Sequence, residues 1–377
     1  GTQESQSVTS FQAQTSYDES RASQITLADQ TATVTGQGAS FSNQTVIITQ
    51  AGTYVLTGSG KNLKLVVEAA DTDQVHLVFQ NLTLEGEGTL LQVNKAQEVV
   101  ISLAEGSQNA LTESQASDDE EVEATIHSQV PLTLNGTGNL TLTALTKNAL
   151  EVEDDLKVLG GAYTVKAANH GFKAEGALDI EAVTLTIEAG KDGLHAEHDE
   201  MIERANISLN PTQLSIAATE DGVDAGNELT IKGGTLTIDA EGDGIDSNGT
   251  VTISGGSLVV NGSVQGGNGP LDAAGDITIT GGTVWALGTS DMLQGFAQGS
   301  TQASITANIA GTAGQTLIIL DANGKEVARQ TASKDFQAVI MSSADLVDGQ
   351  TYTIQVEETT QTATATLVTP VTGGFHP

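Results

Sequence analysis

The chain has 377 residues, of which 48 are acidic and 14 are basic, so its formal charge at neutral pH is −34. A field of this sign repels nucleic acid and anionic membrane surfaces and attracts cations. The acids alternate with apolar residues, which separates the chain from disordered acidic sequences. No stretch approaches 18 consecutive apolar residues, so the sequence predicts no membrane-spanning helix.

The first 24 residues are polar and have no hydrophobic period, and we expect them to form a flexible tether. From Ile25 onward, short alternating runs such as TVIITQAGTYVLTG and VHLVFQNLTLEG turn at Gly or Asn, which is typical of β-strands. Gly is abundant at 42 residues, Pro is rare at five, and helical periodicity is almost absent. The chain is therefore predicted to be all-β.

A short phrase recurs through the middle of the chain. Its first residues follow one another in steps of 22, 22, 29, 22 and 26 positions, at Asn148, His170, Asp192, Asp221, Asp243 and Gly269. A second phrase, seen as IKGGTLTIDA and ISGGSLVVNG, keeps the same interval. A period near 22 residues with two or three short strands per unit is that of one coil of a parallel β-helix, which we predict over residues 25–300.

Two departures from the repeat predict loops. The step of 29 residues has its extra length within EHDEMIERANISLNPTQ, and the segment TESQASDDEEVE at 112–123 reads as an earlier acidic loop. From Thr301 the phrase stops, and QTLIILDANGKEVARQT has the pattern of a hairpin. Residues 301–377 are therefore predicted to form a small antiparallel β domain that covers the open end of the helix, since an uncovered end offers bare strand edges.

The acids of the repeated phrase are predicted to form columns. Because the apolar third residue of each phrase points inward, we expect the glycine at the second position and the fourth residue on the outer face. Equivalent residues of stacked coils lie about 4.8 Å apart. The sequence therefore predicts two neighbouring columns of carboxylates, Asp192, Asp221 and Asp243 in one and Asp224, Asp246 and Asp272 in the other.

The negative charge of such columns has to be compensated. Two unit charges about 4.8 Å apart repel by roughly 3 kcal/mol at an effective dielectric constant near 20. Calcium is a hard cation that takes six to eight oxygen ligands from carboxylates, carbonyls and water. We therefore predict calcium at these six aspartates; the alternative is a solvated acidic face with labile counterions or partly protonated carboxylates.

The earlier coils carry a mixed polar strip instead. Its candidate ligand-binding residues are His170, Lys173, Lys191 and His195. Side chains of these types hydrogen-bond sugar hydroxyls or pair with a uronate carboxylate. Ordinary surface polarity explains the same residues equally well.

The stretch GDGIDSNGTVTISGGSLVVNGSVQGGNGPLDAAGDITITGGTV, followed by GTSDMLQGFAQGSTQASI, resembles a family of bacterial extracellular carbohydrate-binding-domain-containing proteins. The opening segments AGTYVLTGSG and VHLVFQNLTL look like the same family, so the resemblance covers about residues 25–360. It implies a right-handed parallel β-helix similar to that of pectate lyases, bound calcium, and binding of plant-type polysaccharides, including acidic ones, without established catalysis. It also implies export and attachment at the cell surface, often as a lipoprotein.

The family's acidic motif falls here on Asp221, Asp224, Asp243, Asp246 and Asp272, whereas His170 and His195 stand at column positions where acids are expected. Three functions follow. We expect a non-catalytic protein that holds acidic polysaccharide such as polygalacturonate through calcium. The alternatives are a calcium-dependent lyase with Lys173, Lys191 or Arg204 as the base, and a surface adhesin or rod that calcium stiffens. No catalytic residue is assigned.

Overall fold

The computed structural model describes residues 10–370. Regular structure in this range is β-strand throughout, apart from two short 3-10 turns, η1 (Phe11–Ala13) and η2 (Ile202–Arg204). None of the described helices is long and apolar enough to cross a membrane. The prediction of an all-β fold is confirmed.

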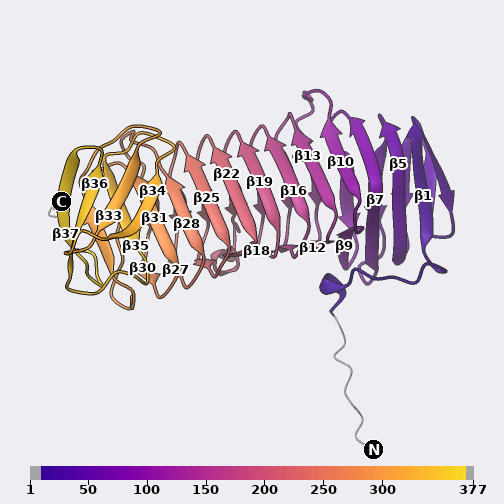
Figure 1. The fold of residues 1–377 in the computed structure, drawn as a ribbon. Coiled ribbons are helices and arrows are strands. Elements are labelled where there is room, and N and C mark those ends of the chain that lie inside the picture. The colour runs from indigo at the N-terminus through magenta and orange to yellow at the C-terminus, as the bar shows by residue number, and fades with distance from the viewer. Residues whose placement is uncertain (1–9, 371–377) are drawn as a thin grey trace, which may run out of the picture.

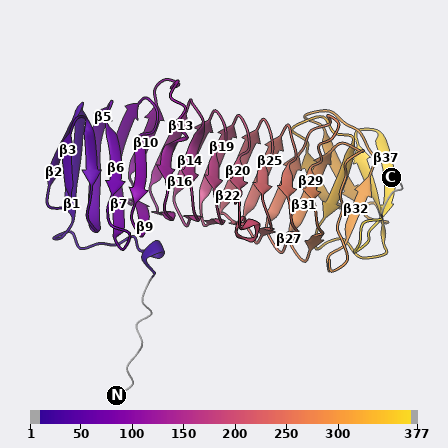
Figure 2. The same cartoon turned by 180° about the vertical axis from the view of Figure 1, so that it is seen from behind.

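The strands stack side by side along one long axis and form three ladders, named here in the order in which the chain passes through them (Figures 1 and 2). Ladder 1 is a sheet of 11 strands, parallel from its second strand onward. Its strands are β3 (Ala39–Ser42), β4 (Thr45–Ile48), β6 (Lys64–Glu68), β8 (Leu91–Lys95), β11 (Ala124–Ser128), β14 (Asn148–Val152), β17 (Phe172–Ala174), β20 (Leu194–Ala196), β23 (Val223–Ala225), β26 (Ile245–Ser247) and β29 (Leu271–Ala273).

Ladders 2 and 3 belong to one sheet of 22 strands, because the long strands β5 (Gly52–Lys61) and β7 (Gln74–Gly86) join them. The further strands of ladder 2 are β9 (Glu98–Leu103), β12 (Leu132–Gly136), β15 (Leu156–Val158), β18 (Leu178–Glu181), β21 (Ile207–Asn210), β24 (Leu229–Ile231), β27 (Val251–Ile253) and β30 (Ile277–Ile279). Those of ladder 3 are β1 (Ser23–Asp29) with its antiparallel neighbour β2 (Thr31–Thr35), β10 (Gln108–Glu113), β13 (Asn139–Ala144), β16 (Ala162–Ala167), β19 (Thr184–Ala189), β22 (Gln213–Ala218), β25 (Thr235–Ala240), β28 (Ser257–Asn261) and β31 (Thr283–Gly288).

The register confirms that the repeated phrases are spatial neighbours. In ladder 1, Leu194 pairs with Val223, Val223 with Ile245, and Ile245 with Leu271. Each phrase is followed by one strand of ladder 2 and one of ladder 3, as in β20, β21 and β22, and we call such a set a unit. Ladders that are mostly parallel, and in which each strand pairs with the equivalent strand of the next unit, are consistent with a β-helix.

The inner faces of the ladders share one apolar core. Leu194, Leu229 and Leu236, one from each ladder, are buried to within 1 % and belong to the same cluster. Burial of a Leu or Ile side chain stabilises a fold by about 1.5–3 kcal/mol. Since each unit contributes inward residues from three strands, neighbouring units complete a core that no unit could close alone.

The glycine at the second position of the phrase faces the core, and the expectation of an outer position is wrong. A Cβ atom on Gly193 would lie 2.5 Å from Cγ2 of buried Ile216 and 2.7 Å from the carbonyl oxygen of Gly222. Gly222 stands in the same relation to Ile238 and to the carbonyl of Gly244. The chain uses glycine here because the next unit's backbone and a core side chain occupy the space that a Cβ would need.

Residues 10–22, which we call the strap, lie against ladder 2 and so differ from the tether expected over residues 1–24. Asn135 Nδ2 donates to the carbonyl oxygens of Gln12 and Gln14 at 2.8 and 2.9 Å. The rings of Phe11 and Tyr17 both meet the ring of His76 edge-on, with centroids 6.2 Å apart. The polar sequence of the strap hid these contacts, which go to residues 60–125 positions away. Residues 1–9 lie outside the described range.

The two predicted loops are present: residues 114–123 separate β10 from β11, and residues 197–206, with η2, separate β20 from β21. At the far end, β35 (Ala338–Ser342) pairs antiparallel with β31 and with β32 (Ser304–Ala307). The remaining strands form an antiparallel sheet in the order β34 (Glu326–Thr331), β33 (Thr316–Leu320), β36 (Thr351–Val356) and β37 (Thr359–Thr364). β35 thus pairs along the edge of ladder 3.

Candidate functional site

The aspartates at the first position of the phrase form a hydrogen-bonded side-chain ladder. Asp192 Oδ1 accepts the backbone N–H of Asp221 at 2.8 Å, and Asp221 Oδ1 accepts that of Asp243 at the same distance. Asp243 Oδ1 in turn accepts the N–H of Gly269 at 2.8 Å. Each first-position carboxylate therefore satisfies a backbone donor of the next unit, and its second oxygen is left for other contacts.

The same ladder begins earlier with neutral side chains. Asn148 Oδ1 accepts the N–H of His170 at 2.9 Å, and His170 Nδ1 accepts that of Asp192 at 3.2 Å. The position thus requires an acceptor and not specifically a charge. The aspartates supply the acceptor and add a negative charge that the ladder itself does not need.

The fourth residues of the phrase form the predicted second column. They pair in register through ladder 1 in the order Glu151, Lys173, His195, Asp224, Asp246 and Asp272. The charge of the side chains changes along this column. Two cationic residues, Lys173 and His195, stand in its middle, and three consecutive aspartates follow them.

His195 compensates the acids around it. Its Nδ1 lies 2.8 Å from Asp192 Oδ2 and 3.1 Å from Asp224 Oδ2, and its Nε2 lies 3.2 Å from Glu197 Oε2. Burial alone would lower the pKa of His195, but these carboxylates outweigh burial and raise the pKa to about 11. His195 is therefore an imidazolium that occupies the space between the two columns.

Two of the other three residues of the strip, Lys173 and His170, are also engaged. Lys173 Nζ lies 2.9 Å from Glu197 and 3.4 Å from Glu151, and these pairs raise the pKa of the ammonium although burial opposes them. His170 stacks on His195 with ring centroids 4.3 Å apart. Burial, and then the charge of His195, lowers the pKa of His170 to about 4, so this ring is neutral and its Nδ1 is free to accept the N–H of Asp192.

Asp221, Asp243, Asp246 and Asp272 have no cationic partner among residues 10–370. One oxygen each of Asp221, Asp243 and Asp246 lie within 4.8 Å of one another, and Asp272 neighbours Asp246 in the column. Burial, followed by the charges of neighbouring aspartates, raises the pKa of Asp221 to about 6, of Asp243 to about 7 and of Asp246 to about 8. We call Asp221, Asp243, Asp246 and Asp272 the acidic cluster.

The donor set of the acidic cluster fits a hard divalent cation. It offers carboxylate oxygens only, whereas the two other groupings that could hold a metal, His170 with Asp192 and His195, and Asp192 with Asp221 and Asp224, have the His195 imidazolium within or beside them. Because the pKa values of Asp243 and Asp246 are raised to about 7 and 8, these two carboxyl groups favour the protonated form more than an ordinary aspartate does, and a bound cation would replace those protons.

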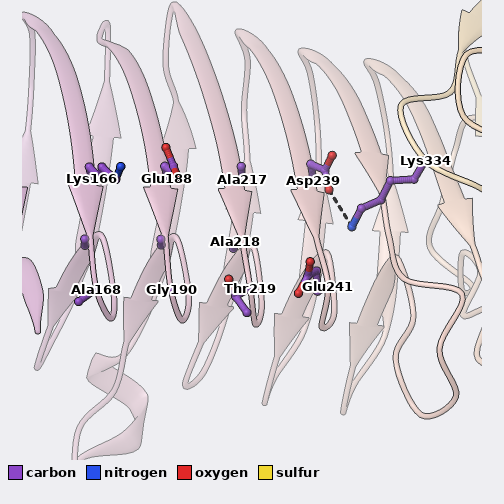
Figure 3. A pocket seen from close by; sticks show the side chains of 12 residues that line it. Lys166, Ala168, Glu188, Gly190, Ala217, Ala218, Thr219, Asp239, Glu241 and Lys334 are labelled. Atoms are coloured by element: carbon purple, nitrogen blue, oxygen red, sulfur yellow. Dashed lines mark ion pairs between the residues drawn. The ribbon is translucent and has the colours of Figure 1, made fainter. Parts of the chain in front are cut away.

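Two cavities adjoin this arrangement. One, of about 570 Å³, is lined by His170, Lys191, Asp192, His195, Asp221 and Asp224 together with the turns beside them. The other, of about 470 Å³, lies over ladder 3, where Figure 3 shows Lys166, Glu188, Ala217 and Asp239 in successive strands. Thr219 and Glu241 line both cavities, so the two share a wall.

The second cavity is closed at one end by the C-terminal domain. Lys334 Nζ reaches Asp239 Oδ1 at 2.7 Å and the carbonyl oxygen of Ala240 at 2.7 Å (Figure 3). Lys166 at the other end and Lys191 in the first cavity form no ion pair within the described residues. The cavity stays open where Ala217 and Ala168 have short side chains and Gly190 has none.

The structure therefore brings the six predicted aspartates together in two columns and places His170, His195 and Lys191 at the same cavity. Three of the four candidate ligand residues are held by neighbouring side chains, and Lys191 alone is exposed and unpaired within residues 10–370. Arg204 lies elsewhere, with its Nη2 3.2 and 3.3 Å from Asp154 and Asp155. Sequence reasoning missed Lys334, because no local pattern links it to Asp239 some 95 positions earlier.

Comparisons with known proteins point to one family. A family model described as carbohydrate-binding domain-containing protein matches residues 42–295 and 207–374. A protein of that description from Acetivibrio thermocellus is 31% identical over 136 residues, which is 34% of this chain and 48% of that protein, so the match spans about half the relative's length.

A solved structure described as the polysaccharide lyase-like protein from C. thermocellum, in a gadolinium derivative, is similar with a TM-score of 0.54 and 24% identity, covering 71% of this chain and 99% of that one. This likeness concerns the fold. The family match extends from residue 42 to residue 374, and this chain belongs to the carbohydrate-binding domain-containing proteins.

Proposed function

We propose that this protein binds an acidic polysaccharide, such as polygalacturonate, through calcium held at the acidic cluster, and that it does so outside the cell, attached to the cell surface as a lipoprotein. Family membership supports a polysaccharide partner. The observation that carries the calcium site is the set of three carboxylates within 4.8 Å of one another, uncompensated by any side chain of residues 10–370.

The contrast within the columns supports a site of limited extent. Where His195 and Lys173 stand, the chain supplies its own cations and the carboxylates are already paired. Past His195, burial and mutual repulsion raise the pKa values of Asp221, Asp243 and Asp246 instead. An external divalent cation would act in those later units, held by Asp221, Asp243, Asp246 and Asp272, with Asp224 and Asp192 at the border that His195 already occupies.

Calcium would also resolve the charge problem of the ligand. A protein of charge −34 repels a uronate polymer, and a cation between the two sets of carboxylates converts that repulsion into attraction. The shared wall of the two cavities gives such a chain a path from the acidic cluster over ladder 3, past the unpaired Lys191 and Lys166.

The finer fold that we propose is a right-handed parallel β-helix with closed coils of about 22 residues.

We do not assign catalysis to this site. Of the three candidate bases, Lys173 contacts two carboxylates and Arg204 contacts two others, so neither is placed to take a proton from a ligand at the acidic cluster. Lys191, which lines the cavity and is unpaired within residues 10–370, is the candidate base that a lyase would use. Binding without cleavage is the simpler proposal. It is separated from lyase activity by the absorbance of the unsaturated uronide that β-elimination creates.

The test is calorimetric titration of chelator-stripped protein with calcium, followed by binding of polygalacturonate with and without the ion. We expect saturable calcium uptake, and retention of the polymer only when calcium is present. Asp246→Asn removes a charged ligand from the cluster and is expected to weaken calcium binding at least about tenfold. Asp348→Asn, an equal change of charge at an exposed position of the C-terminal domain, is the matched control.

Uptake that is non-saturable, or equal in the two variants, would show that the columns hold only diffuse counterions. Saturable uptake without calcium-dependent retention of the polymer would keep the metal site and reject its role in binding acidic glycan. Neither result would change the family membership, which rests on the match to the family model.

A further inference from the structure

The few aromatic side chains of this protein are not distributed evenly over its surface. Within residues 10–370, eight of the aromatic side chains are buried, and the partly exposed ones are Phe11, Tyr17 and Phe41. Phe11 and Tyr17 both belong to the strap. The strap therefore carries most of the aromatic surface that the described chain offers to a ligand.

A cavity of about 490 Å³ lies beside Phe11, between the strap and the starts of β5 and β7. Its walls contain no Asp, Glu, Lys or Arg. Hydroxyl and amide groups take their place, since the side chains that line it with Phe11 and His76 include Gln14, Thr53, Thr72 and Gln97. A wall without charge is uncommon in a chain with 62 charged residues and a net charge of −34, and it selects a ligand that is polar but uncharged.

The hydrogen bonds behind the cavity determine the protonation state and the tautomer of the His76 imidazole. Asn135 donates both bonds from Nδ2 to the strap, so its Oδ1 is the acceptor for the Ser102 hydroxyl. Because Ser102 gives its one proton to Asn135, its oxygen must accept from His76 Nε2, 2.7 Å away. His76 is thus neutral, in agreement with the lowering of its pKa to about 4 by burial, and its Nδ1 is a lone-pair acceptor that has no partner within the described chain.

The amide wall is anchored in a similar way. Glu98 accepts a hydrogen bond from Gln74 Nε2 at 3.0 Å and another from the amide of Gln12 in the strap. Gln74 also lines the cavity, and its Oε1 remains available as an acceptor. Gln97 and Thr72 present exposed side chains for which no hydrogen bond is formed within residues 10–370.

An aromatic side chain next to amide and hydroxyl groups that both donate and accept is the combination that recognises a sugar ring through its apolar face and its hydroxyls, and the buried, unpartnered Nδ1 of His76 lies behind it. We propose that the cavity beside the strap is a second saccharide subsite, that it takes uncharged sugar residues, and that it needs no metal ion. This inference rests on the proposed function in one respect, that the ligand is a saccharide. It differs in location, charge and metal dependence.

The experiment is affinity electrophoresis of the whole protein through gels that contain a neutral soluble polysaccharide, in the presence of a chelator. Galactomannan, xyloglucan and hydroxyethyl cellulose are the probes, and polygalacturonate with calcium is run in parallel. We expect retardation by at least one of the neutral polymers, undiminished by the chelator. Phe11→Leu keeps an apolar side chain without an aromatic face, and it should weaken that retardation by about three- to tenfold.

Two further variants keep the result interpretable. Phe41→Leu makes the same change at the partly exposed ring outside the strap and should behave as the unaltered protein does. Gln97→Ala removes an amide from the cavity wall without touching a strap hydrogen bond and should weaken binding of the neutral polymer while leaving the melting temperature unchanged.

The outcomes separate the two proposals. If no neutral polymer is bound, or if Phe11→Leu and Gln97→Ala bind as Phe41→Leu does, the second subsite is rejected, whatever happens with polygalacturonate. If polygalacturonate and calcium fail while the neutral polymer is held through Phe11, the calcium proposal falls and the subsite stands. Asp246→Asn should alter only the calcium-dependent arm.

Discussion

At the scale of single residues, the aspartates of the first column serve two purposes that a substitution can separate. One oxygen accepts a backbone N–H from the next unit, as Asp243 Oδ1 does from Gly269, and the charge repels the neighbouring acids. Asn148 performs the first task without the second. The charge is therefore kept for something other than the ladder, and a bound cation is the explanation that we propose.

Asp243→Asn and Asp243→Ala should have opposite effects on chelator-treated protein. Asparagine keeps the acceptor for Gly269 and removes a carboxylate whose pKa is raised to about 7, so the free energy of unfolding at pH 8 should stay level or rise. Alanine leaves that N–H without its partner and should cost about 1–3 kcal/mol. Urea unfolding measures both, and equal losses in the two variants would contradict the dual role.

The acidic cluster also predicts how stability depends on pH. The folded pKa of Asp243, about 7, and of Asp246, about 8, lie above the unfolded value of 3.8, so the folded state binds more protons over this window. Stability without metal should therefore fall as pH rises from about 6.5 to 8.5. His195, whose pKa rises from 6.5 to about 11, contributes with the same sign. His170 and His76, whose pKa values fall from 6.5 to about 4 on folding, contribute with the opposite sign near pH 6.5, and this contribution fades above that pH as the unfolded imidazoles lose their protons.

Melting temperatures of chelator-treated protein at pH 6.5 and 8.5 check this prediction. Asp246→Asn should flatten the dependence, because it removes the carboxylate with the highest pKa in the cluster. Saturating calcium should flatten it as well. A melting temperature that rises over this interval would be incompatible with the raised pKa values of Asp243 and Asp246.

At the scale of strands, the turn that leads into each strand of ladder 1 tolerates an added side-chain atom as poorly as the core does. Gly222→Ala places a Cβ atom 2.3 Å from Cγ2 of Ile238 and 2.6 Å from the carbonyl oxygen of Gly244. The backbone of the next unit has to move, and overpacking of this kind costs about 1–3 kcal/mol. Gly266→Ala, at a position with open space around it, is the control and should leave chemical denaturation unchanged.

Much of this element-level order could be predicted from the sequence. The spacing of Asp221, Asp243 and the equivalent residues gave the register of ladder 1 correctly, because a stacked repeat converts sequence period into spatial contact. The direction of the second-position glycine could not be obtained from strand alternation, since the turn before β23 does not follow that alternation. The strap and Lys334 were missed because their contacts, with Asn135 and Asp239, join segments that share no period.

At the scale of the whole molecule, the charge of −34 predicts a broad response to salt and a narrow one to calcium. Sodium chloride screens all exposed carboxylates and should raise the melting temperature gradually up to about 1 M. Calcium at a single class of sites should instead act at concentrations near its dissociation constant, with stabilisation that follows RT ln(1 + [Ca²⁺]/Kd). Magnesium, which demands near-octahedral geometry and keeps its water, should act more weakly.

Thermal melts in titrations of the three salts distinguish these responses. Asp246→Asn should lose the calcium response and keep the sodium response, and Asp348→Asn should keep both. Identical curves for calcium and magnesium in the unaltered protein would indicate screening alone.

The strap gives the chain an order of assembly. Gln12 and Gln14 are synthesised before Asn135, whose amide holds them and which lies more than 120 residues later in the chain. Before β12 has been added to ladder 2, a growing chain can hold the strap through His76 and Glu98 but lacks the two hydrogen bonds from Asn135. The strap is therefore fully docked only after β12 has joined ladder 2, and until then Phe11 and Tyr17, which pack against His76, are more open to chaperones and proteases.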